Sequence, residues 1–321
     1  MRVAVLCGGR SSEHDVSLRS GEAVARGLEE AGHEVALVTI SRAGEWSCEG
    51  GPVELAPGRG LLGAAAAFPA LHGPFGEDGS MQGLLEWLDL PYVGSDVLSS
   101  ALCMDKLTLK RLFAQAGVPQ VDFVAAGESG WRERCERMGA PLWVKPSRLG
   151  SSVGISKVDD LALLEEAVAL ARRHDPRVIV EASAAGREVE CSLLGNEDVE
   201  ASLPGEIVAD GDWYDYETKY REGGMDLVVP VPLPEEQLAR VRALAVSAFE
   251  LSGCAGLARC DFFVEPDGAV LVNEINTMPG FTETSVYAKL WEASGIPYPD
   301  LCDRLVALAL ERHRRTRAYE F

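Results

Sequence analysis

The chain has 321 residues, of which 47% are hydrophobic and 25% charged, as is usual for a globular protein of two or three domains. Its 50 acidic residues against 30 basic ones give a net charge of −20, which argues against nucleic acid or anionic membranes as partners. No apolar run is long enough for a signal peptide or a membrane span, so we expect a cytoplasmic protein. The 8 cysteines include no C-x-x-C pair, and we expect reduced, mostly buried thiols.

The N-terminal segment alternates strands with a helix. A strand over residues 2–7 leads through a polar loop into a helix over 16–31, and a second strand covers 34–40. This order predicts a parallel α/β sheet with the loop at its carboxyl edge, where such sheets bind ligands. The loop lacks G-x-G-x-x-G spacing, so a dinucleotide site is not supported. Within the loop, Glu13 either holds an ammonium group or interacts with the helix dipole.

A second Gly-rich loop over residues 71–79 precedes a helix over 81–88. His72 in this loop either contacts a ligand or has a structural role. A short strand over 91–94 marks the exit from the first domain, and we expect one continuous helix over 99–116.

Short strands and helices alternate over residues 121–181 and predict a small α+β module. Within it, the Gly/Ser segment 150–154 is typical of a mobile flap whose N–H groups and hydroxyls wrap phosphate oxygens. Lys145 ends a strand beside the flap, and Lys106 lies on a neighbouring element. A single lysine is usually a surface group, but two lysines that bracket such a flap favour phosphate binding.

The C-terminal part begins with an alternating strand over 188–194. The polar, aromatic stretch 204–226 reads as a lid, with Lys219 and Tyr220 at its tip, because long excursions from compact domains are usually lids or disordered. Helices are expected over 233–251 and 299–312.

Between these helices, residues 259–281 predict a hairpin closed by the turn Pro266-Asp267-Gly268. Folding at the turn brings Asp261 opposite Glu274, and strict alternation puts Val272, Glu274 and Asn276 on one face. Two carboxylates this close repel each other. Either Mg²⁺ resolves the conflict, or the acids are paired to Arg in a solvated hairpin face.

Two lysines, a flap, an acidic hairpin and a lid together indicate an ATP-dependent enzyme without a Walker loop, since no G-x-x-x-x-G-K-[S/T] occurs. Over residues 3–310 the chain closely resembles D-alanine–D-alanine ligases of the ATP-grasp superfamily. The matching stretches are GGRSSEHDVSLRSG (8–21), LHGPFGEDG (71–79), MDK (104–106), VKPSRLGSSVG (144–154), YDYETKY (214–220), RCD (259–261) and NEINTMPGFT (273–282).

This resemblance implies a set of nucleotide contacts. The ATP phosphates would meet three lysines and the flap: Lys106, Lys145, Lys219, Ser151 and Ser152. Adenine and ribose would be bound by Glu181, Ala182, Ala184 and Glu188, although Ala182 replaces a side chain that is often charged in the family. Two Mg²⁺ (or Mn²⁺) ions would be held by Asp261, Glu274 and Asn276.

The resemblance also implies substrate contacts. Glu13 would bind the ammonium of the first D-alanine and be linked to Ser151 and Tyr220 by hydrogen bonds that lock the lid. The second D-alanine would bind at Ser285 beside Val286, where the family usually has leucine. Arg259 and the Gly280 N–H would form an oxyanion hole, and the remaining substrate contacts would be His72 and Lys219.

The implied architecture is an ATP-grasp fold of the α/β and α+β classes. An N-terminal substrate domain (1–95) would precede a central domain (96–181) and a C-terminal domain (182–321), the last two sandwiching ATP. The implied activity joins two D-alanines through an acyl phosphate for peptidoglycan precursor synthesis, in a homodimer.

Three alternatives are weighed against this interpretation, and only the first stays open. A D-alanine–D-lactate or D-alanine–D-serine ligase would share most motifs, although relatives that use D-lactate generally lack the lid tyrosine, here Tyr220. A non-catalytic nucleotide sensor would be expected to have gaps among the site residues, and none is missing. An NAD(P)-linked oxidoreductase lacks support from the glycine spacing.

Overall fold

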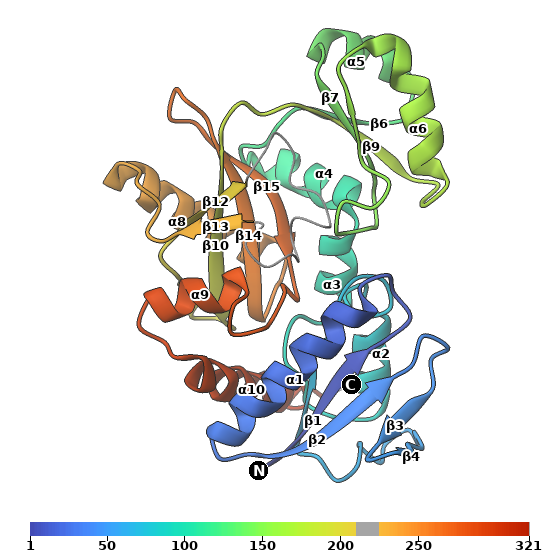
Figure 1. Ribbon diagram of the computed structural model, residues 1–321, viewed down its shortest axis with the longest axis vertical. Coiled ribbons are helices and arrows are strands. Elements are labelled where there is room, and N and C mark those ends of the chain that lie inside the picture. Colours follow the sequence, from blue (N-terminus) through green and yellow to red (C-terminus); the bar gives the residue numbers. More distant parts are fainter. Residues whose placement is uncertain (210–224, 321) are drawn as a thin grey trace.

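The computed structural model describes residues 1–209 and 225–320, and their strands form three sheets. Figure 1 shows the N-terminal sheet at the bottom, the central sheet at the top and the C-terminal sheet between them on the left. Helices α3 (Val97–Met104) and α4 (Lys106–Ala116) run upward through the middle and connect these layers. The predicted lid residues Lys219 and Tyr220 lie outside the described residues.

The N-terminal sheet has the order β4-β3-β2-β1-β5. The pair β1–β2 is parallel, as predicted, and β1 also pairs in parallel with β5. The expectation of a parallel sheet holds only for these strands, because β2–β3 and β3–β4 are antiparallel. Its strands are β1 (Arg2–Gly8), β2 (Glu34–Ile40), β3 (Trp46–Cys48), β4 (Gly51–Pro52) and β5 (Ala66–Pro69). Helices α1 (His14–Glu30) and α2 (Ser80–Trp87) complete this unit. Gly21 lets α1 approach β1, because a Cβ there would stand 2.3 Å from the Cys7 Cβ. The expected strand at 91–94 is reduced to a bridge between Ala67 and Tyr92.

The central sheet is antiparallel with the order β6-β9-β7-β8. Its elements are β6 (Phe123–Ala125), α5 (Trp131–Met138), β7 (Leu142–Pro146), β8 (Ser156–Val158), the 3₁₀ turn η1 (Leu161–Leu163), α6 (Leu164–Arg172) and β9 (Val178–Ala182). Leu142, Val144 and Val180 point from the strands into a core shared with α6. Leu142 and Val144 are two residues apart on β7, so their side chains lie on the same face of the sheet.

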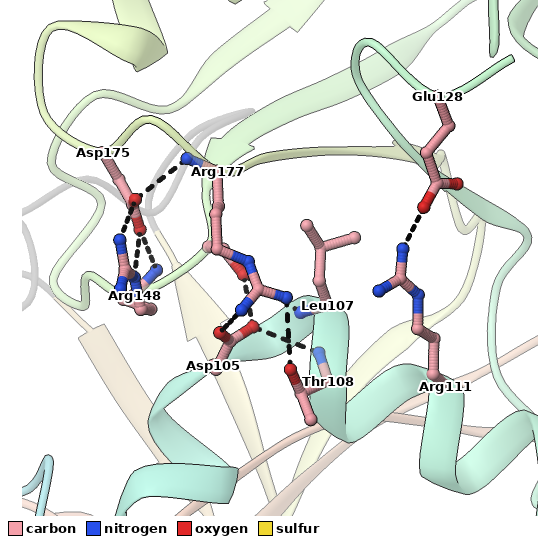
Figure 2. Close-up of polar contacts among 9 residues, drawn as sticks. Asp105, Leu107, Thr108, Arg111, Glu128, Arg148, Asp175 and Arg177 are labelled. Atoms are coloured by element: carbon pink, nitrogen blue, oxygen red, sulfur yellow. Dashed lines mark hydrogen bonds and ion pairs between the residues drawn. The ribbon is translucent and has the colours of Figure 1, made fainter.

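The expectation of one helix over 99–116 is wrong, because the chain breaks at Asp105. Asp105 adopts an extended conformation, with φ −90° and ψ 93°, and its carboxylate caps α4 by accepting from the Thr108 N–H at 3.1 Å. The same carboxylate accepts from Ser147 Oγ at 2.8 Å and pairs with Arg177 at 2.6 Å. Figure 2 shows Arg177, the residue just before β9, against the Asp105 carboxylate that caps α4.

The C-terminal sheet is antiparallel with the order β13-β12-β10-β14-β15, and β11 pairs with β10. Its strands are β10 (Arg187–Gly195), β11 (Glu200–Ala201), β12 (Gly205–Ala209), β13 (Met225–Val228), β14 (Gly256–Val264) and β15 (Val270–Asn276). The remaining helices are α8 (Glu235–Leu251), α9 (Val286–Ala293) and α10 (Tyr298–Thr316).

The hydrophobic cores combine residues that are far apart in the sequence. Leu109 and Phe113 of α4 pack in the core of the C-terminal sheet, whereas Leu107 of the same helix packs against Ile179 of the central sheet. Helix α10 returns to the N-terminal unit and lies beside α1, as Figure 1 shows. Its Leu305 packs in one core with Val3 of β1 and Val24 of α1. The domain boundaries at residues 95 and 181 remain predictions.

Two composition-based predictions can be compared with the described residues. All 8 cysteines are free thiols, and 7 of them are buried, as expected. Within residues 1–209 and 225–320, no helix is both long and apolar enough to cross a bilayer.

Candidate active site

A cavity of about 700 Å³ collects most of the predicted site residues. Its walls come from the N-terminal loops, the start of α4, the flap, β10, the β14–β15 hairpin and the segment before α9. The predicted residues that line it are Glu13, His72, Lys106, Ser151, Glu188, Arg259, Asp261, Glu274, Asn276, Gly280, Ser285 and Val286. Residues more than 250 positions apart in the chain therefore face one space.

Some predicted residues do not line this cavity. Those among the described residues are Lys145, Ser152, Glu181, Ala182 and Ala184. Lys145 and Glu181 pair with each other at 2.6 Å between strands β7 and β9. The predicted lid contacts of Lys219 and Tyr220 lie outside the described residues.

The acidic hairpin forms as predicted, with Asp261 directly opposite Glu274. The turn closes with Gly268 at φ +94°, a conformation that favours glycine. The expectation that Val272 shares a face with Glu274 is wrong. The register shifts between Asp261 and Phe262, so one extra residue enters β15 and reverses the alternation. Val272 therefore packs in the core, while Glu274 and Asn276 face the cavity.

Arg259 lies between two carboxylates on this face. Its Nε and Nη2 each donate to Asp261 at 2.7 Å, and Nε also pairs with Glu190 at 2.8 Å. Burial opposes its charge, but Asp261 and Glu190 hold the pKa of the guanidinium well above its usual range. Asn276 Nδ2 donates to Asp261 at 3.1 Å. The ion pair that the sequence left as an alternative is thus present, in a cavity wall rather than on a solvated face.

The donor chemistry of the predicted metal site fits Mg²⁺. Over the described part of the chain, no group of three or more His, Cys, Asp and Glu side chains is placed to hold a metal ion. The predicted set is different in kind, since it consists of the carboxylates of Asp261 and Glu274 and the amide of Asn276 on one sheet face. These are hard oxygen donors, and Mg²⁺ needs only one or two protein carboxylates beside substrate phosphates.

Glu13 is aimed at the flap rather than at its own helix. It is the N-cap residue of α1, yet its side chain makes no capping hydrogen bond. Its carboxylate accepts a hydrogen bond from Ser151 Oγ, a contact that joins residues 138 positions apart. Gly73 fits closely against this carboxylate, because a Cβ there would stand 2.5 Å from Glu13 Oε2. Glu13 therefore contacts the flap and lines the cavity, and its binding of an ammonium group stays a prediction.

His72 fixes the segment that carries Gly280. The ring is buried, and its Nδ1 lies 3.0 Å from the Met278 carbonyl oxygen, which can only accept. Nδ1 is therefore the protonated nitrogen, and Nε2 accepts from Ser20 Oγ at 2.9 Å. Burial lowers the pKa of His72, which keeps the ring neutral. Since His72 also lines the cavity, both roles left open by the sequence are compatible with its position.

The segment after Gly280 leads into α9, a helix that the sequence pattern did not reveal. Ser285 is its N-cap residue, and Ser285 Oγ accepts from the Thr282 N–H at 2.9 Å. Val286 begins the helix and is buried against Leu290. The hydroxyl and the apolar side chain thus face the cavity side by side.

Lys106 joins the flap to the hairpin. Its Nζ donates to the Leu149 carbonyl at 2.9 Å and lies 3.4 Å from the Glu274 carboxylate. Within the flap, Ser151 and Ser152 adopt left-handed backbone conformations, with φ of 52° and 60°. Such values are uncommon for residues other than glycine and occur at binding loops.

Two acidic residues of the cavity were missed by sequence reasoning. Glu190 of β10 lies opposite Asp261 of β14 in the strand register. Since side chains alternate along a strand, Glu188 and Glu190 share a face, and this was the signal that could have identified Glu190. Glu77 lies in the 71–79 loop, where its carboxylate accepts from the Gly73 N–H at 2.6 Å. Burial and the nearby charge of Glu13 raise the pKa of Glu77 to about 8.

Three sheets, with a cavity that has Lys106 and the flap on one wall and the carboxylates of Asp261 and Glu274 on another, define a protein of the ATP-grasp class. Family models described as D-ala D-ala ligase N-terminus and C-terminus match residues 2–57, 53–95 and 112–307. The chain belongs to the D-alanine–D-alanine ligase family.

Curated relatives match along the whole chain. A D-alanine–D-alanine ligase from Solibacter usitatus is 46% identical over 324 residues, covering 100% of this chain and 99% of the relative. One from Deinococcus radiodurans is 46% identical, covering 97% of this chain and 98% of the relative.

Solved structures agree with the fold. The D-alanine–D-alanine ligase from Coxiella burnetii has a TM-score of 0.89 at 37% identity, covering 99% of this chain and 96% of that one. The VanG D-Ala:D-Ser ligase from Enterococcus faecalis has a TM-score of 0.86 at 33% identity, covering 96% and 99%. The predicted α/β and α+β ATP-grasp fold is confirmed.

Proposed function

We propose that this enzyme joins two D-alanine molecules into D-alanyl-D-alanine at the expense of ATP, releasing ADP and phosphate. The observation that carries the proposal is the single cavity faced by Glu13, Arg259 and Ser285, three residues proposed for three different steps. Family membership supports it. Two relatives named D-alanine–D-alanine ligase are each 46% identical over at least 97% of this chain, which favours D-alanine as the second substrate.

The nucleotide would lie between the central and C-terminal sheets. Lys106, Lys145 and Lys219 would offset the charge of its phosphates, and Ser151 and Ser152 would add hydroxyl and N–H donors from the flap. Adenine would lie against the strand end at Glu181, Ala182 and Ala184, with the ribose at Glu188. Asp261, Glu274 and Asn276 would hold two Mg²⁺ ions, which would neutralise phosphate charge and orient the transferred phosphoryl group.

Glu13 would hold the ammonium of the first D-alanine and leave its carboxylate free to attack the γ-phosphate. The products of this step are an acyl phosphate and ADP, so a carboxylate oxygen becomes part of a leaving group. The hydrogen bond from Ser151 to Glu13 supports this role, because it joins the flap to the carboxylate that would hold the amino acid. Closure by the flap, with Tyr220 completing the bridge, would keep water from hydrolysing the acyl phosphate.

The second D-alanine would bind through its carboxylate at Ser285, with its methyl group near Val286. Its amine attacks the acyl carbonyl, and the resulting oxyanion would be stabilised by Arg259 and the Gly280 N–H. His72 supports the second donor, because it fixes the carbonyl two residues before Gly280. Collapse of the tetrahedral intermediate expels phosphate and leaves the dipeptide. One oxyanion donor contributes about 2.7–4 kcal/mol in enzymes of known mechanism.

Several further features belong to the same proposal. The dipeptide would serve peptidoglycan precursor synthesis in the cytoplasm, and the functional unit would be a homodimer. The segments 1–95, 96–181 and 182–321 would act as the substrate domain and the two nucleotide-binding domains.

The test uses purified protein with ATP and Mg²⁺, supplied in parallel with D-alanine, L-alanine, D-alanine plus D-lactate, and D-alanine plus D-serine. We expect ADP, phosphate and D-alanyl-D-alanine from D-alanine alone, and no product from L-alanine. A mixed product formed in preference to the homodipeptide would assign the chain to the D-lactate or D-serine ligases. No phosphate release under any condition would refute the proposal.

A further inference from the structure

A buried ionic trio lies behind the predicted nucleotide site. Glu181 of β9 is paired through Oε1 with Lys110 of α4 at 3.0 Å and through Oε2 with Lys145 of β7 at 2.6 Å. Lys110 and Glu181 are each only 2% exposed. Neither lines the cavity, so Lys110 is not placed to touch a ligand there.

The trio joins one carboxylate to two amines. Burial lowers the pKa of Lys110, whereas the Glu181 carboxylate, 3.0 Å away, opposes this shift and favours the ammonium form. Burial alone would raise the pKa of Glu181, but Lys110 and Lys145 hold it down to about 2, so the carboxylate is ionised. Burial likewise opposes the charge of Lys145, yet the carboxylates of Glu181, Glu274 and Glu188 raise its pKa above the usual value. Two of these acids line the cavity, which places Lys145 within electrostatic reach of a ligand there.

The charge balance depends on Lys110. If Glu181 had only Lys145 as a partner, the pair would be neutral, and the field that Lys145 exerts on an anionic ligand would be largely cancelled. With Lys110 on the other carboxylate oxygen, the trio retains a net positive charge. This balance is local, and it stands out in a chain whose net charge is −20.

We infer that Lys110 is a positioning residue that offsets the Glu181 charge, so that Lys145 keeps its positive charge for the phosphates of the nucleotide. This inference rests on the proposed function, since it takes the bound anion to be a nucleotide triphosphate. The packing of α4 supports it. Leu107 contacts the central sheet, whereas Leu109 contacts the C-terminal core, so the helix that carries Lys110 is anchored to both sheets.

A tether that merely joins α4 to β9 is the competing explanation. It predicts a loss of stability without a change in how the protein discriminates phosphates. The two explanations therefore differ in one measurable ratio, the affinity for ATP divided by the affinity for adenosine.

The experiment measures binding to the full chain by calorimetry with Mg²⁺ and either the β,γ-imido analogue of ATP or adenosine. We expect K110M to weaken binding of the analogue by about tenfold while adenosine binding is unchanged, because only the phosphates sense the lost charge. K110R, which keeps the charge, should retain most of the affinity. The matched control is K157M, since Lys157 is an exposed lysine of β8 whose partner is Asp159 at 3.4 Å.

The double variant K110M/E181Q restores the net charge of the trio, because it removes one positive and one negative group. Its ratio of analogue to adenosine affinity should return close to that of the wild type, even if the Glu181→Gln change weakens binding of both ligands. An unchanged ratio in K110M, or a lowered ratio that the double variant does not restore, would overturn the inference. Failure of the proposed function has a separate signature, because wild-type protein would then bind neither ligand.

Discussion

Glu13 and Glu77 bring two carboxylates to one corner of the cavity, and only Glu13 receives a hydroxyl from the flap. Glu77 accepts from the Gly73 N–H, but burial and the charge of Glu13 make its ionised form costly. The pKa of Glu77 therefore lies at about 8, within the range where enzymes are assayed. Because this pKa differs from that of a glutamate in the unfolded chain, the free energy of unfolding depends on pH.

We predict that Glu77→Gln removes a pH dependence of stability. A carboxyl group with a raised folded-state pKa stabilises the protein fully below its unfolded-state pKa, and this contribution is lost as the pH rises through about 8. Urea unfolding of both proteins between about pH 5 and pH 9 should show the wild type losing on the order of 3 kcal/mol relative to the variant.

The control for this measurement is Glu166→Gln, which removes an exposed carboxylate from α6. Its stability should follow the wild type across the same pH range. If the free energy of unfolding changed with pH in the same way in Glu77→Gln and in the wild type, Glu77 would not be the group responsible for the pH dependence.

At the residue scale, the sequence was enough to identify carboxylates that lie close together on an otherwise apolar hairpin. Asp261 and Glu274 could be paired from the turn and the alternation alone, because both rules are local. Glu77 could not be assigned, because its role depends on Glu13 and the Gly73 N–H, which only tertiary folding brings near it. The partnership of Lys110 with Glu181 was hidden for the same reason, since 71 positions separate them in the chain.

Loop 71–79 packs closely against the loop that carries Glu13, and Gly73 is the point of contact. Gly73 has φ +72°, and a Cβ there would stand 2.5 Å from Glu13 Oε2. We predict that Gly73→Ala displaces the Glu13 carboxylate and raises the KM for D-alanine at the first site by roughly tenfold or more, about 1.4 kcal/mol of lost binding. The measurement is initial velocity against D-alanine concentration.

Gly63→Ala provides a control with matched backbone strain. Gly63 has φ +69°, but no atom lies within 4 Å of a Cβ built there. Both variants should lose about 1–2 kcal/mol of stability from the left-handed conformation, and only Gly73→Ala should change KM. An equal change of KM in both would mean that strain, rather than contact with Glu13, is responsible.

At the element scale, periodicity located most long helices and strands, but it failed where tertiary partners decide the outcome. The helix break at Asp105 depends on Ser147 and Arg177, which compete with continuation of the helix. The bulge in β15 is equally invisible to strict alternation, and it moved Val272 to the core. Short strands such as β11, with two residues, carry too little pattern to be recognised.

At the scale of the whole molecule, composition and motif order were enough for the fold class, since the matched segments follow one another along the chain. They were not enough for the cores, because burial joins segments that sequence order separates. Helix α10 is the clearest case. It is the last element of the chain, yet it packs on α1 and β5 of the N-terminal unit.

We therefore predict that Leu305→Ala, at the far end of the chain, loosens the N-terminal sheet. Leu305 is fully buried in a core with Val3 and Phe68, and such truncations cost about 2–5 kcal/mol. Hydrogen exchange should accelerate in α1 and β5, because these are the elements of the N-terminal unit that pack on α10. Leu170→Ala on α6 is the matched control, since that leucine is 39% exposed and its truncation should cost at most about 0.5 kcal/mol. Faster exchange confined to the C-terminal sheet in Leu305→Ala would contradict the assignment of α10 to the N-terminal core.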